Sequence, residues 1–419
     1  MLRHLHPQAL ICSYTHKAYR LKLIKSSITK KYKQQRKPCL SLQMHQTEMS
    51  VINVLANQYY IYMKRGEKPI PWNIYDSNPP INFGSATYFS QVLQTIENSF
   101  QVSGLIFYVT WDQIDELPSY GANVVVLVIG DEWYRIPKYA HKVRAVFKCI
   151  GTRPILGCNP FRQPSLLNWL TLIQFLRVLL VCSPGLINYH FHKLKSWLSG
   201  KATIGRIFEI PLGYNNSKNL PIKNIKDRLY ETYFSGSVIH IPYPVWSLKY
   251  WLGTPKALSR KLMISSLKKF QKKNPSLKVE LSITGGFRNR TSEDERSYCE
   301  IMMDTKICLV PRGTSFETTR LFEAMKYGCI LVTETLPSRW YLDGAPVIQI
   351  KDWRDVEKIL ENLLDNQQLM EELHQKSLNW WKHKCSEAIV GNYMIEKLTG
   401  DIPLWKKHAA DLSMSLTPP

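Results

Sequence analysis

Short runs of consecutive apolar residues, separated by helical or polar segments, constrain the fold of this chain most. The first half contains GLIFYVT (104–110), NVVVLVIG (123–130) and RAVFKCIG (144–151), and IFEIPLGY (207–214) closes it. Strands that are apolar throughout, rather than in alternation, are covered on both faces, as in a parallel α/β sheet. The first half is therefore predicted to form such a sheet.

The second half repeats this alternation of strands and helices. Strands are predicted at 233–240, 278–286, 305–311 and 329–334, and helices at 259–274, 315–327 and 353–373. Regular strand–helix alternation is typical of doubly wound sheets. The sequence thus predicts an α/β protein with two Rossmann-like domains that face each other across a cleft.

The length and composition support this division. A chain of 419 residues is long for one core, and an apolar fraction of 44% is enough for two. We expect a basic, disordered extension at 1–48, an acceptor-side domain at 49–214 and a polar linker at 215–230. A second domain follows at 231–380, and a helical tail at 381–419 is expected to pack back toward the first.

The positive charge is concentrated in two stretches. Residues 1–50 carry +9 and residues 133–208 carry +12 of the net charge of +22, and the second stretch contains no Asp or Glu. Such a surface suits anionic lipid, an anionic substrate or nucleic acid.

The most apolar segment lies inside the second basic stretch. Leu166 to Val181 is sixteen residues long, which is short for a transmembrane helix, and polar residues interrupt it. A buried helix is the favoured interpretation. A helix lying in a membrane interface is the alternative, because Lys193, Lys195 and Lys201 follow it.

The cysteines indicate a reducing compartment. Nine are present, an odd number without a CxxC pair, so most are expected to be buried free thiols. No signal peptide is recognised, because no apolar stretch follows the basic N-terminus. We expect a cytoplasmic protein, peripheral at a membrane, with a Golgi-type lumen as the less favoured location.

Three glycine turns follow predicted strands of the second half. They contain Gly236 and Ser237, then Gly285 and Gly286 with Arg288 behind them, and then Arg312 and Gly313. Ligands of doubly wound sheets bind at the carboxyl ends of strands, where glycines let backbone N–H groups approach a phosphate. Each turn alone is weak evidence, since most such turns only reverse the chain.

The stretch CLVPRGTSFETTRLFEAMKYGCILV (308–332) is more specific. Thr314 and Glu317 predict a capping box at a helix start, and Gly328 predicts its C-terminal end. Arg320 and Glu323 share one helix face, where the bland interpretation is an exposed ion pair of little value. A helix start behind a strand is also an anion site, so the pair is predicted to read a nucleotide: N–H groups and Arg312 for phosphate, the carboxylate for ribose.

At this point the sequence resembles the exostosin-type glycosyltransferases. The residues that carry the resemblance are Pro311-Arg312-Gly313, Thr318-Thr319-Arg320, Leu321-Phe322-Glu323-Ala324, Gly328-Cys329-Ile330 and Val332. They follow the order and spacing of that family's signature, and about 120 residues resemble it well. The resemblance implies a GT-B fold, a nucleotide-sugar donor that is usually UDP-linked, and inverting transfer without a metal. Carried over to this chain, it implies that Glu323 binds ribose, and that Arg312, Arg320 and the segment with Thr314, Ser315 and Thr319 bind phosphate or sugar.

The acceptor and the catalytic base are less constrained. In a GT-B enzyme the first domain holds the acceptor, so the basic stretch favours an anionic or lipid-linked glycan acceptor. Asp131 and Glu132 follow a predicted strand and are candidate bases, although a solvated turn is as good an interpretation. No metal site and no cofactor is expected, because the nucleotide-sugar is a co-substrate and the histidines lack ligand spacing. The alternative function is a non-enzymatic, basic nucleic-acid-binding protein, suggested by the charge and by 11% aromatic residues.

Overall fold

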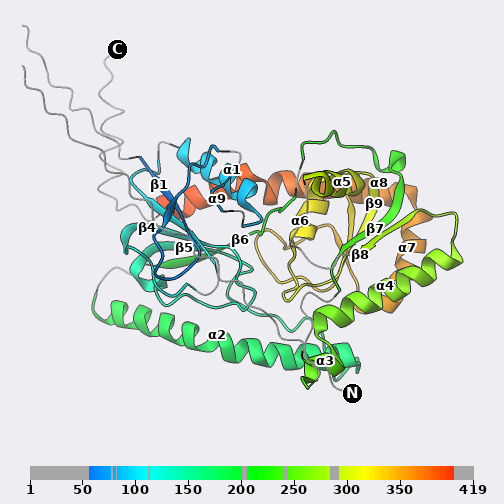
Figure 1. Ribbon diagram of the computed structural model, residues 1–419, viewed down its shortest axis with the longest axis horizontal. Helices are drawn as coiled ribbons and strands as arrows, with labels where there is room; N and C mark the ends of the chain where they lie inside the picture. The colour runs from blue at the N-terminus through cyan, green and yellow to red at the C-terminus, as the bar shows by residue number, and fades with distance from the viewer. Residues whose placement is uncertain are drawn as a thin grey trace, which may run out of the picture. The chain divides into compact units, whose positions relative to one another are not determined.

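The computed structural model describes residues 56–400, apart from 77–78, 82, 100, 112–113, 201–204, 217, 239–243, 245 and 284–291. The predicted extension at 1–48 therefore lies outside the described residues. Two sheets form the frame of the described part (Figure 1).

The first sheet has the strand order β2-β1-β3-β4-β5-β6, and every neighbouring pair is parallel except β1 and β2. Its strands are β1 (Gln58–Tyr62), β2 (Ile70–Pro71), β3 (Ile106–Thr110), β4 (Gly121–Val128), β5 (Val143–Cys149) and β6 (Arg206–Ile210). Both faces are covered, as the apolar runs predicted. On β4, Val125 and Leu127 belong to one core, while Val124, Val126 and Val128 belong to another.

The second sheet has the order β11-β10-β9-β7-β8 and is parallel throughout. Its strands are β7 (Tyr230–Gly236), β8 (Val279–Ile283), β9 (Thr305–Val310), β10 (Ile330–Thr333) and β11 (Val347–Gln349). Numbered along its own segment this is the order 2-1-3-4-5, which is typical of doubly wound sheets. Two parallel α/β sheets confirm the predicted fold class, the GT-B arrangement of two Rossmann-like domains. The exact domain limits stay predictions.

Nine helices accompany the sheets in the described residues. They are α1 (Ala86–Glu97), α2 (Leu166–Leu198), α3 (Leu248–Leu252), α4 (Pro255–Lys273), α5 (Ser292–Met303), α6 (Thr319–Lys326), α7 (Val356–Leu364), α8 (Gln367–Trp380) and α9 (Glu387–Thr399). The single helix predicted at 353–373 is in fact a turn of 3-10 helix followed by α7 and α8. The break occurs because the Asn366 side chain accepts a hydrogen bond from Leu369 N (2.9 Å) and so starts a new helix.

The last helix returns to the first sheet. Figure 1 shows α9 beside α1, and the two pack closely. A β-carbon built on Gly391 would lie 2.6 Å from Thr95 Cβ, so glycine permits this approach.

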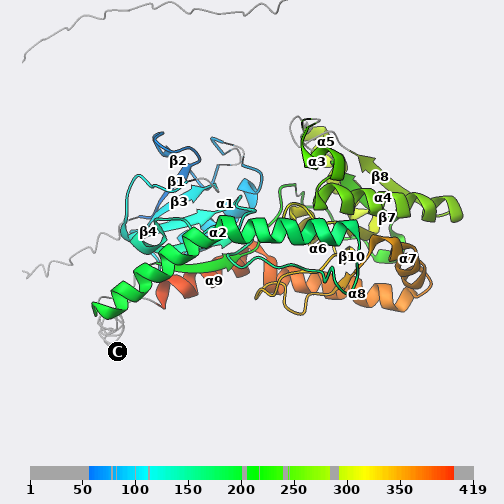
Figure 2. The ribbon, with the colours of Figure 1, turned by 90° about the horizontal axis from the view of Figure 1, so that it is seen from below.

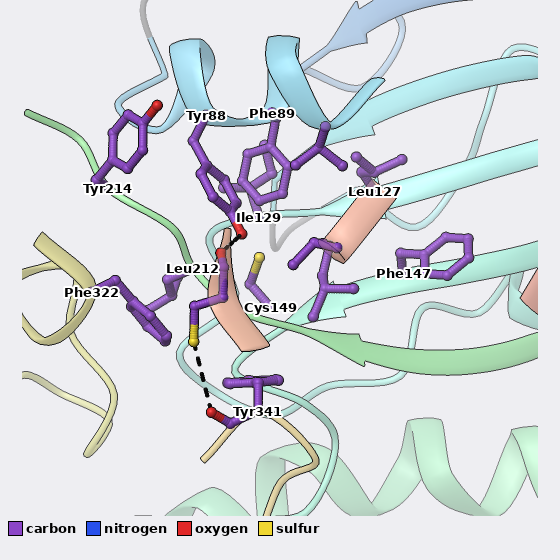
Figure 3. Close-up of a cluster of buried hydrophobic side chains, with 14 of the residues drawn as sticks. Tyr88, Phe89, Leu127, Ile129, Phe147, Cys149, Leu212, Tyr214, Phe322 and Tyr341 are labelled. Atoms are coloured by element: carbon purple, nitrogen blue, oxygen red, sulfur yellow. Dashed lines mark hydrogen bonds between the residues drawn. The ribbon is translucent and has the colours of Figure 1, made fainter. Parts of the chain in front are cut away.

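Side chains from both halves also share a core. Figure 3 shows Tyr88, Phe147 and Cys149 of the first half in one cluster with Phe322 and Tyr341 of the second. The Tyr88 hydroxyl donates to the Cys385 carbonyl (2.7 Å), while the Cys385 thiol donates to the Tyr341 carbonyl at 3.7 Å. The two halves are thus joined by apolar packing near the start of α9.

Helix α2 differs most from its prediction. It has 33 residues rather than sixteen. Only 17% of its most apolar 18-residue stretch is buried. The prediction of a buried helix is therefore wrong. By length and composition alone, α2 is the one helix among the described residues that could cross a membrane.

The length of α2 has a local cause. Ser165 caps its start by accepting a hydrogen bond from Asn168 N (3.1 Å). Pro184 lacks the N–H that would bond the Leu180 carbonyl, but the Ser183 hydroxyl donates to that carbonyl instead (3.2 Å). The helix therefore continues through a proline that the sequence pattern treats as a break.

Candidate functional site

A group of buried polar atoms lies where β7 ends and α6 begins. Gly236 ends β7 and Ser237 follows it, Arg312 and Gly313 follow β9, and Arg320 belongs to the first turn of α6. The first N–H groups of a helix have no partner within the helix, so this edge of the sheet offers donors to an anion.

Arg320 is the central residue of this group. Its Nη2 donates to the Ser235 carbonyl, and its guanidinium lies over the Phe234 ring at 4.7 Å from the centroid. Its Nε and Nη1 are buried without a partner, and so are the hydroxyl oxygens of Ser237 and Thr318. Buried donors in native proteins are almost always satisfied. Four unsatisfied polar atoms on Arg320, Ser237 and Thr318, at the end of β7 and the start of α6, therefore indicate a place for an anionic ligand.

The glycine at the end of β7 is needed for this geometry. A β-carbon built on Gly236 would lie 2.6 Å from Arg320 Nη2, which is closer than such contacts allow. Gly236 thus allows the guanidinium to reach the carboxyl end of the strand.

Two further cations lie near Arg320. Burial, followed by the positive charge of Arg320, lowers the pKa of Arg260. Burial and the charge of Arg260 likewise lower the pKa of Lys256 below its ordinary value. Glu132 opposes these shifts in both residues, and Glu334 also opposes the shift of Arg260. The excess positive charge suits a ligand with at least two negative charges.

Helix α6 begins later than predicted. Its N-terminal cap is Thr318, and the predicted capping box of Thr314 and Glu317 is wrong. Glu317 instead forms a buried ion pair with Arg339 (2.6 Å) and accepts a hydrogen bond from the Tyr341 hydroxyl (2.8 Å). A charged partner outside the helix therefore outcompetes the local cap. The predicted end is confirmed, because Gly328 has a φ of +70° directly after α6.

The residues between Gly313 and α6 form a loop. The Ser315 hydroxyl donates to the Glu317 carbonyl (2.8 Å), and the Thr314 carbonyl accepts from Gln174 Nε2 of α2 (2.9 Å). Thr319 is the first residue of α6. A β-carbon on Gly313 would lie 3.5 Å from Thr318 Cγ2 and 3.8 Å from Glu132 Oε1, so this loop borders the cation cluster.

Arg312 is buried nearby, but its charge is already neutralised. It forms an ion pair with Glu334, and its Nη1 donates to the Thr171 hydroxyl of α2 (2.9 Å). The guanidinium also lies over the Phe316 ring, 4.3 Å from the centroid. Its contacts join the loop to the first half of the chain, while phosphate binding by Arg312 stays a prediction.

Glu323 is buried on α6 with both carboxylate oxygens in use. Oε1 accepts from the backbone N–H groups of Asn215 (3.0 Å) and Asn216 (2.9 Å), and Oε2 accepts from the Tyr298 hydroxyl (2.7 Å). A ribose would have to share or replace these bonds. Ribose binding by Glu323 therefore stays a prediction, and in this structure the carboxylate holds the 215–216 segment.

The two candidate bases have different surroundings. Asp131 is buried, forms an ion pair with the buried Lys148 (2.9 Å), and accepts from the N–H groups of Trp133 (2.9 Å) and Arg135 (2.6 Å). Glu132 is half-buried and lies toward Lys256 and Arg260. Glu132 is thus the member of the pair that the structure brings to the cation cluster.

Several predicted residues lie elsewhere, and two site residues were not predicted. Gly285, Gly286 and Arg288 fall outside the described residues. Lys256 and Arg260 were not identified from the sequence, although a signal existed. Arg260 is in helical phase with Ala257, Ile264 and Leu267, and all four are buried on α4. No group of three or more His, Cys, Asp or Glu within the described part of the chain could hold a metal ion.

A family model and two curated relatives resemble this chain. The family model described as the RXYLT1 C-terminal domain matches residues 246–395, which is less than half of the chain. Ribitol-5-phosphate xylosyltransferase 1 of Danio rerio is 26% identical over 214 residues, 45% of this chain and 45% of the relative. The Homo sapiens protein of the same name is 26% identical over 200 residues, 43% of this chain and 42% of the relative. The chain thus matches less than half the length of either relative.

Solved structures give weaker matches. The OtsA apo structure has a TM-score of 0.39 at 11% identity and covers 83% of this chain and 100% of its own. The pneumococcal O-GlcNAc transferase GtfA in complex with UDP and GlcNAc has a TM-score of 0.36 at 10% identity, covering 78% and 62%. The fold assignment rests on the two sheets themselves. The names of the two sequence relatives support the predicted enzyme class, a glycosyltransferase.

Proposed function

We propose that this chain is a glycosyltransferase that moves a sugar from a nucleoside-diphosphate sugar, UDP-linked, to an acceptor that carries phosphate. The single observation behind this proposal is the buried, partly unsatisfied guanidinium of Arg320 at the start of α6. The exostosin-type resemblance of the same segment and the xylosyltransferase names of the two relatives point in the same direction.

The diphosphate of the donor fits the cation cluster. Arg320 offers Nε and Nη1, and the hydroxyls of Ser237 and Thr318 offer two further donors. Lys256 and Arg260 supply the remaining positive charge. During transfer the bond between the anomeric carbon and the diphosphate oxygen breaks, and negative charge develops on the leaving group. Fixed cations at that point stabilise it, a role that a divalent metal fills in other enzymes. We therefore infer metal-independent transfer.

The acceptor side lies in the first half. A cavity of about 500 Å³ borders the end of β4, and its lining includes Asp115, Asp131, Arg135, Lys138 and Asn188. Two of these side chains are cationic and two are carboxylates, and they pair as Arg135 with Asp131 and Lys138 with Asp115, so the lining is polar and can exchange partners with a charged ligand. A phosphorylated acceptor suits such a lining, and the relatives' name specifies a ribitol-5-phosphate acceptor for those proteins. We propose a phosphorylated polyol or a glycan that contains one.

Glu132 is the proposed base. The acceptor hydroxyl attacks the anomeric carbon, its proton passes to the Glu132 carboxylate, and the diphosphate leaves with the bonding electrons. Attack from the side opposite the leaving group inverts the anomeric configuration. Asp131 is the weaker candidate because Lys148 and two backbone N–H groups already occupy its oxygens.

A donor and acceptor screen tests this proposal. The full chain is incubated with UDP-xylose, UDP-glucose or UDP-N-acetylglucosamine, in EDTA, with ribitol 5-phosphate or ribitol as acceptor. We expect glycosylation of the phosphorylated acceptor from one donor, with inverted anomeric configuration by NMR. Failure of every donor, or a requirement for a divalent metal, would contradict the proposal. A Glu132→Gln chain should retain UDP binding and lose transfer.

A further inference from the structure

Helix α2 carries an apolar stripe on the side that faces away from its own domain. Nine exposed side chains follow one another at intervals of three, four or seven residues along 33 residues. They are Leu166, Trp169, Ile173, Leu176, Leu180, Ile187, Phe191, Leu194 and Leu198. Residues at such intervals lie on one face of a helix. Leu180 is 75% and Ile187 68% exposed, so this face has no cover among the described residues.

The opposite face holds α2 to the rest of the protein. Leu167, Thr171, Val178 and Cys182 are buried there. Thr171 accepts from Arg312, and a β-carbon on Gly185 would lie 2.5 Å from the Ile136 carbonyl oxygen. These contacts hold the helix from Leu167 to Gly185, so the apolar stripe there is a fixed surface of the folded protein. Figure 2 shows α2 as a long helix along one side of the described part.

The charges beside the stripe indicate its partner. Arg177 and Lys195 lie along one side of it, and both are exposed. No acid occurs between residues 133 and 208. Tryptophans stand near both ends, Trp169 at 41% and Trp197 at 73% exposure. An apolar face bordered by cations and by aromatic rings is the pattern of helices that lie in the headgroup layer of a membrane.

We propose that α2 binds the surface of an anionic membrane, lying parallel to the bilayer with its apolar stripe inserted. A helix of 33 residues is about 50 Å long, whereas the hydrocarbon core of a bilayer is about 30 Å thick. A spanning helix would also have to give up the buried contacts of Thr171, Val178 and Cys182. Membrane docking through α2 is independent of sugar transfer.

Vesicle sedimentation of the full chain tests this proposal. The vesicles are phosphatidylcholine alone or phosphatidylcholine with phosphatidylglycerol, each at low and high salt. We expect binding to the anionic vesicles, weaker binding at high salt and weaker binding to the neutral vesicles.

Matched variants distinguish binding through the apolar stripe from non-specific binding by other exposed residues. Ile187→Asn with Phe191→Asn should weaken binding by more than about tenfold, because two large apolar side chains that would move from water into the membrane are replaced by polar ones. The control is Ile222→Asn with Leu229→Asn, two exposed apolar residues outside α2, which should change little. For charge, Lys195→Glu should weaken binding, whereas Lys268→Glu on the exposed face of α4 should not to the same degree. Circular dichroism checks that each variant is folded.

Three outcomes would overturn the proposal. One is equal binding by the stripe variant and the wild type. Another is a dimer in light scattering that the stripe variant converts to a monomer while vesicles are ignored, which would assign the stripe to a second copy of the chain. The third is protein that only detergent removes from vesicles, at any salt concentration, since that behaviour indicates a spanning helix.

Discussion

The guanidinium of Arg320 is buried, and only one of its three nitrogens donates a hydrogen bond within the protein, so its role in ligand binding is testable. Arg320→Lys keeps the charge but loses the Nε and Nη1 donors, which have no partner in the protein. A charge-assisted hydrogen bond contributes roughly 1.5–3 kcal/mol, so the affinity for UDP should fall by one to two orders of magnitude. Calorimetric titration measures it. The exposed Arg296→Lys on α5 is the control and should bind as the wild type does.

Gly236 provides a second test at the same site. Gly236→Ala places a methyl group 2.6 Å from Arg320 Nη2, so the guanidinium has to move. We expect weaker UDP binding with a folded protein, since the guanidinium lies at the end of its side chain. Gly66→Ala is a useful control, because no atom lies within 4 Å of its added carbon, although its φ of +78° carries backbone strain. Unchanged UDP affinity in Gly236→Ala would contradict the assigned position of Arg320.

Asp131 and Lys148 form a buried pair, and removal of one partner should be costly. Asp131→Asn leaves the Lys148 charge buried and uncompensated, which typically costs 3–5 kcal/mol of unfolding free energy. Burial lowers the pKa of Lys148, and loss of the carboxylate lowers it further. Because the folded pKa then lies below the unfolded one, the variant should regain stability as the pH rises between these two values. Denaturant unfolding across alkaline pH measures this.

The double variant Asp131→Asn with Lys148→Met completes this test. It removes both charges and should recover most of the lost stability. If Asp131→Asn folds as stably as the wild type but loses transfer, Asp131 has a catalytic role and the structural assignment fails.

At the scale of single elements, the start of α6 is determined by tertiary contacts and not by the local capping pattern. The Thr-x-x-Glu pattern predicted a helix start at Thr314, but Glu317 pairs with Arg339 and Tyr341 instead. Thr314→Ala should therefore leave the stability almost unchanged, whereas Glu317→Gln should lower it clearly, because the buried Arg339 then keeps only Glu209 as a charged partner. Thermal unfolding of the two variants checks this. A similar loss of stability in both variants would support the predicted capping box and contradict this account.

Among the described residues, eight strands (β3 to β10) were predicted from the sequence, while the short or edge strands β1, β2 and β11 and the extent of α2 were not. A strand that is covered on both faces needs apolar residues at every position, so it can be recognised from the sequence as an unbroken apolar run. Within α2, the Ser183 hydroxyl supplies a hydrogen bond to the carbonyl that Pro184 leaves without its usual donor, which a residue pattern does not reveal. Its exposure depends on what the neighbouring elements leave uncovered. In the site, Arg320 could be identified from its motif, whereas Lys256 and Arg260 come from a helix without one.

At the scale of the whole molecule, the candidate site takes residues from both halves. Arg320, Lys256 and Arg260 come from the second half, and Glu132 comes from the first. Contacts between Arg312 and Thr171, and between Glu323 and the 215–216 segment, join the halves beside the site. The charge at the site therefore depends on how both halves of the described part fold together.

This shared charge predicts how UDP binding depends on pH. The pKa of Lys256 is lowered from 10.5 in the free protein, and a bound diphosphate should raise it again. Binding is then strongest below the free-state pKa and weakens as the pH rises through it, by at most about one log unit in affinity per pH unit for one proton. Lys256→Met should flatten this profile. A wild-type affinity independent of pH across this range would contradict the assigned role of Lys256.

The central claim is that the buried cation cluster binds a nucleoside diphosphate without a metal. Calorimetric titration of UDP into the full chain in EDTA tests it most directly, with uridine as the ligand that lacks the diphosphate. We predict saturable binding of UDP, much weaker binding of uridine, and a stabilisation of about 2.7 kcal/mol when UDP is present at 100 times its dissociation constant. Absence of UDP binding in EDTA, with binding restored by magnesium or manganese, would contradict it.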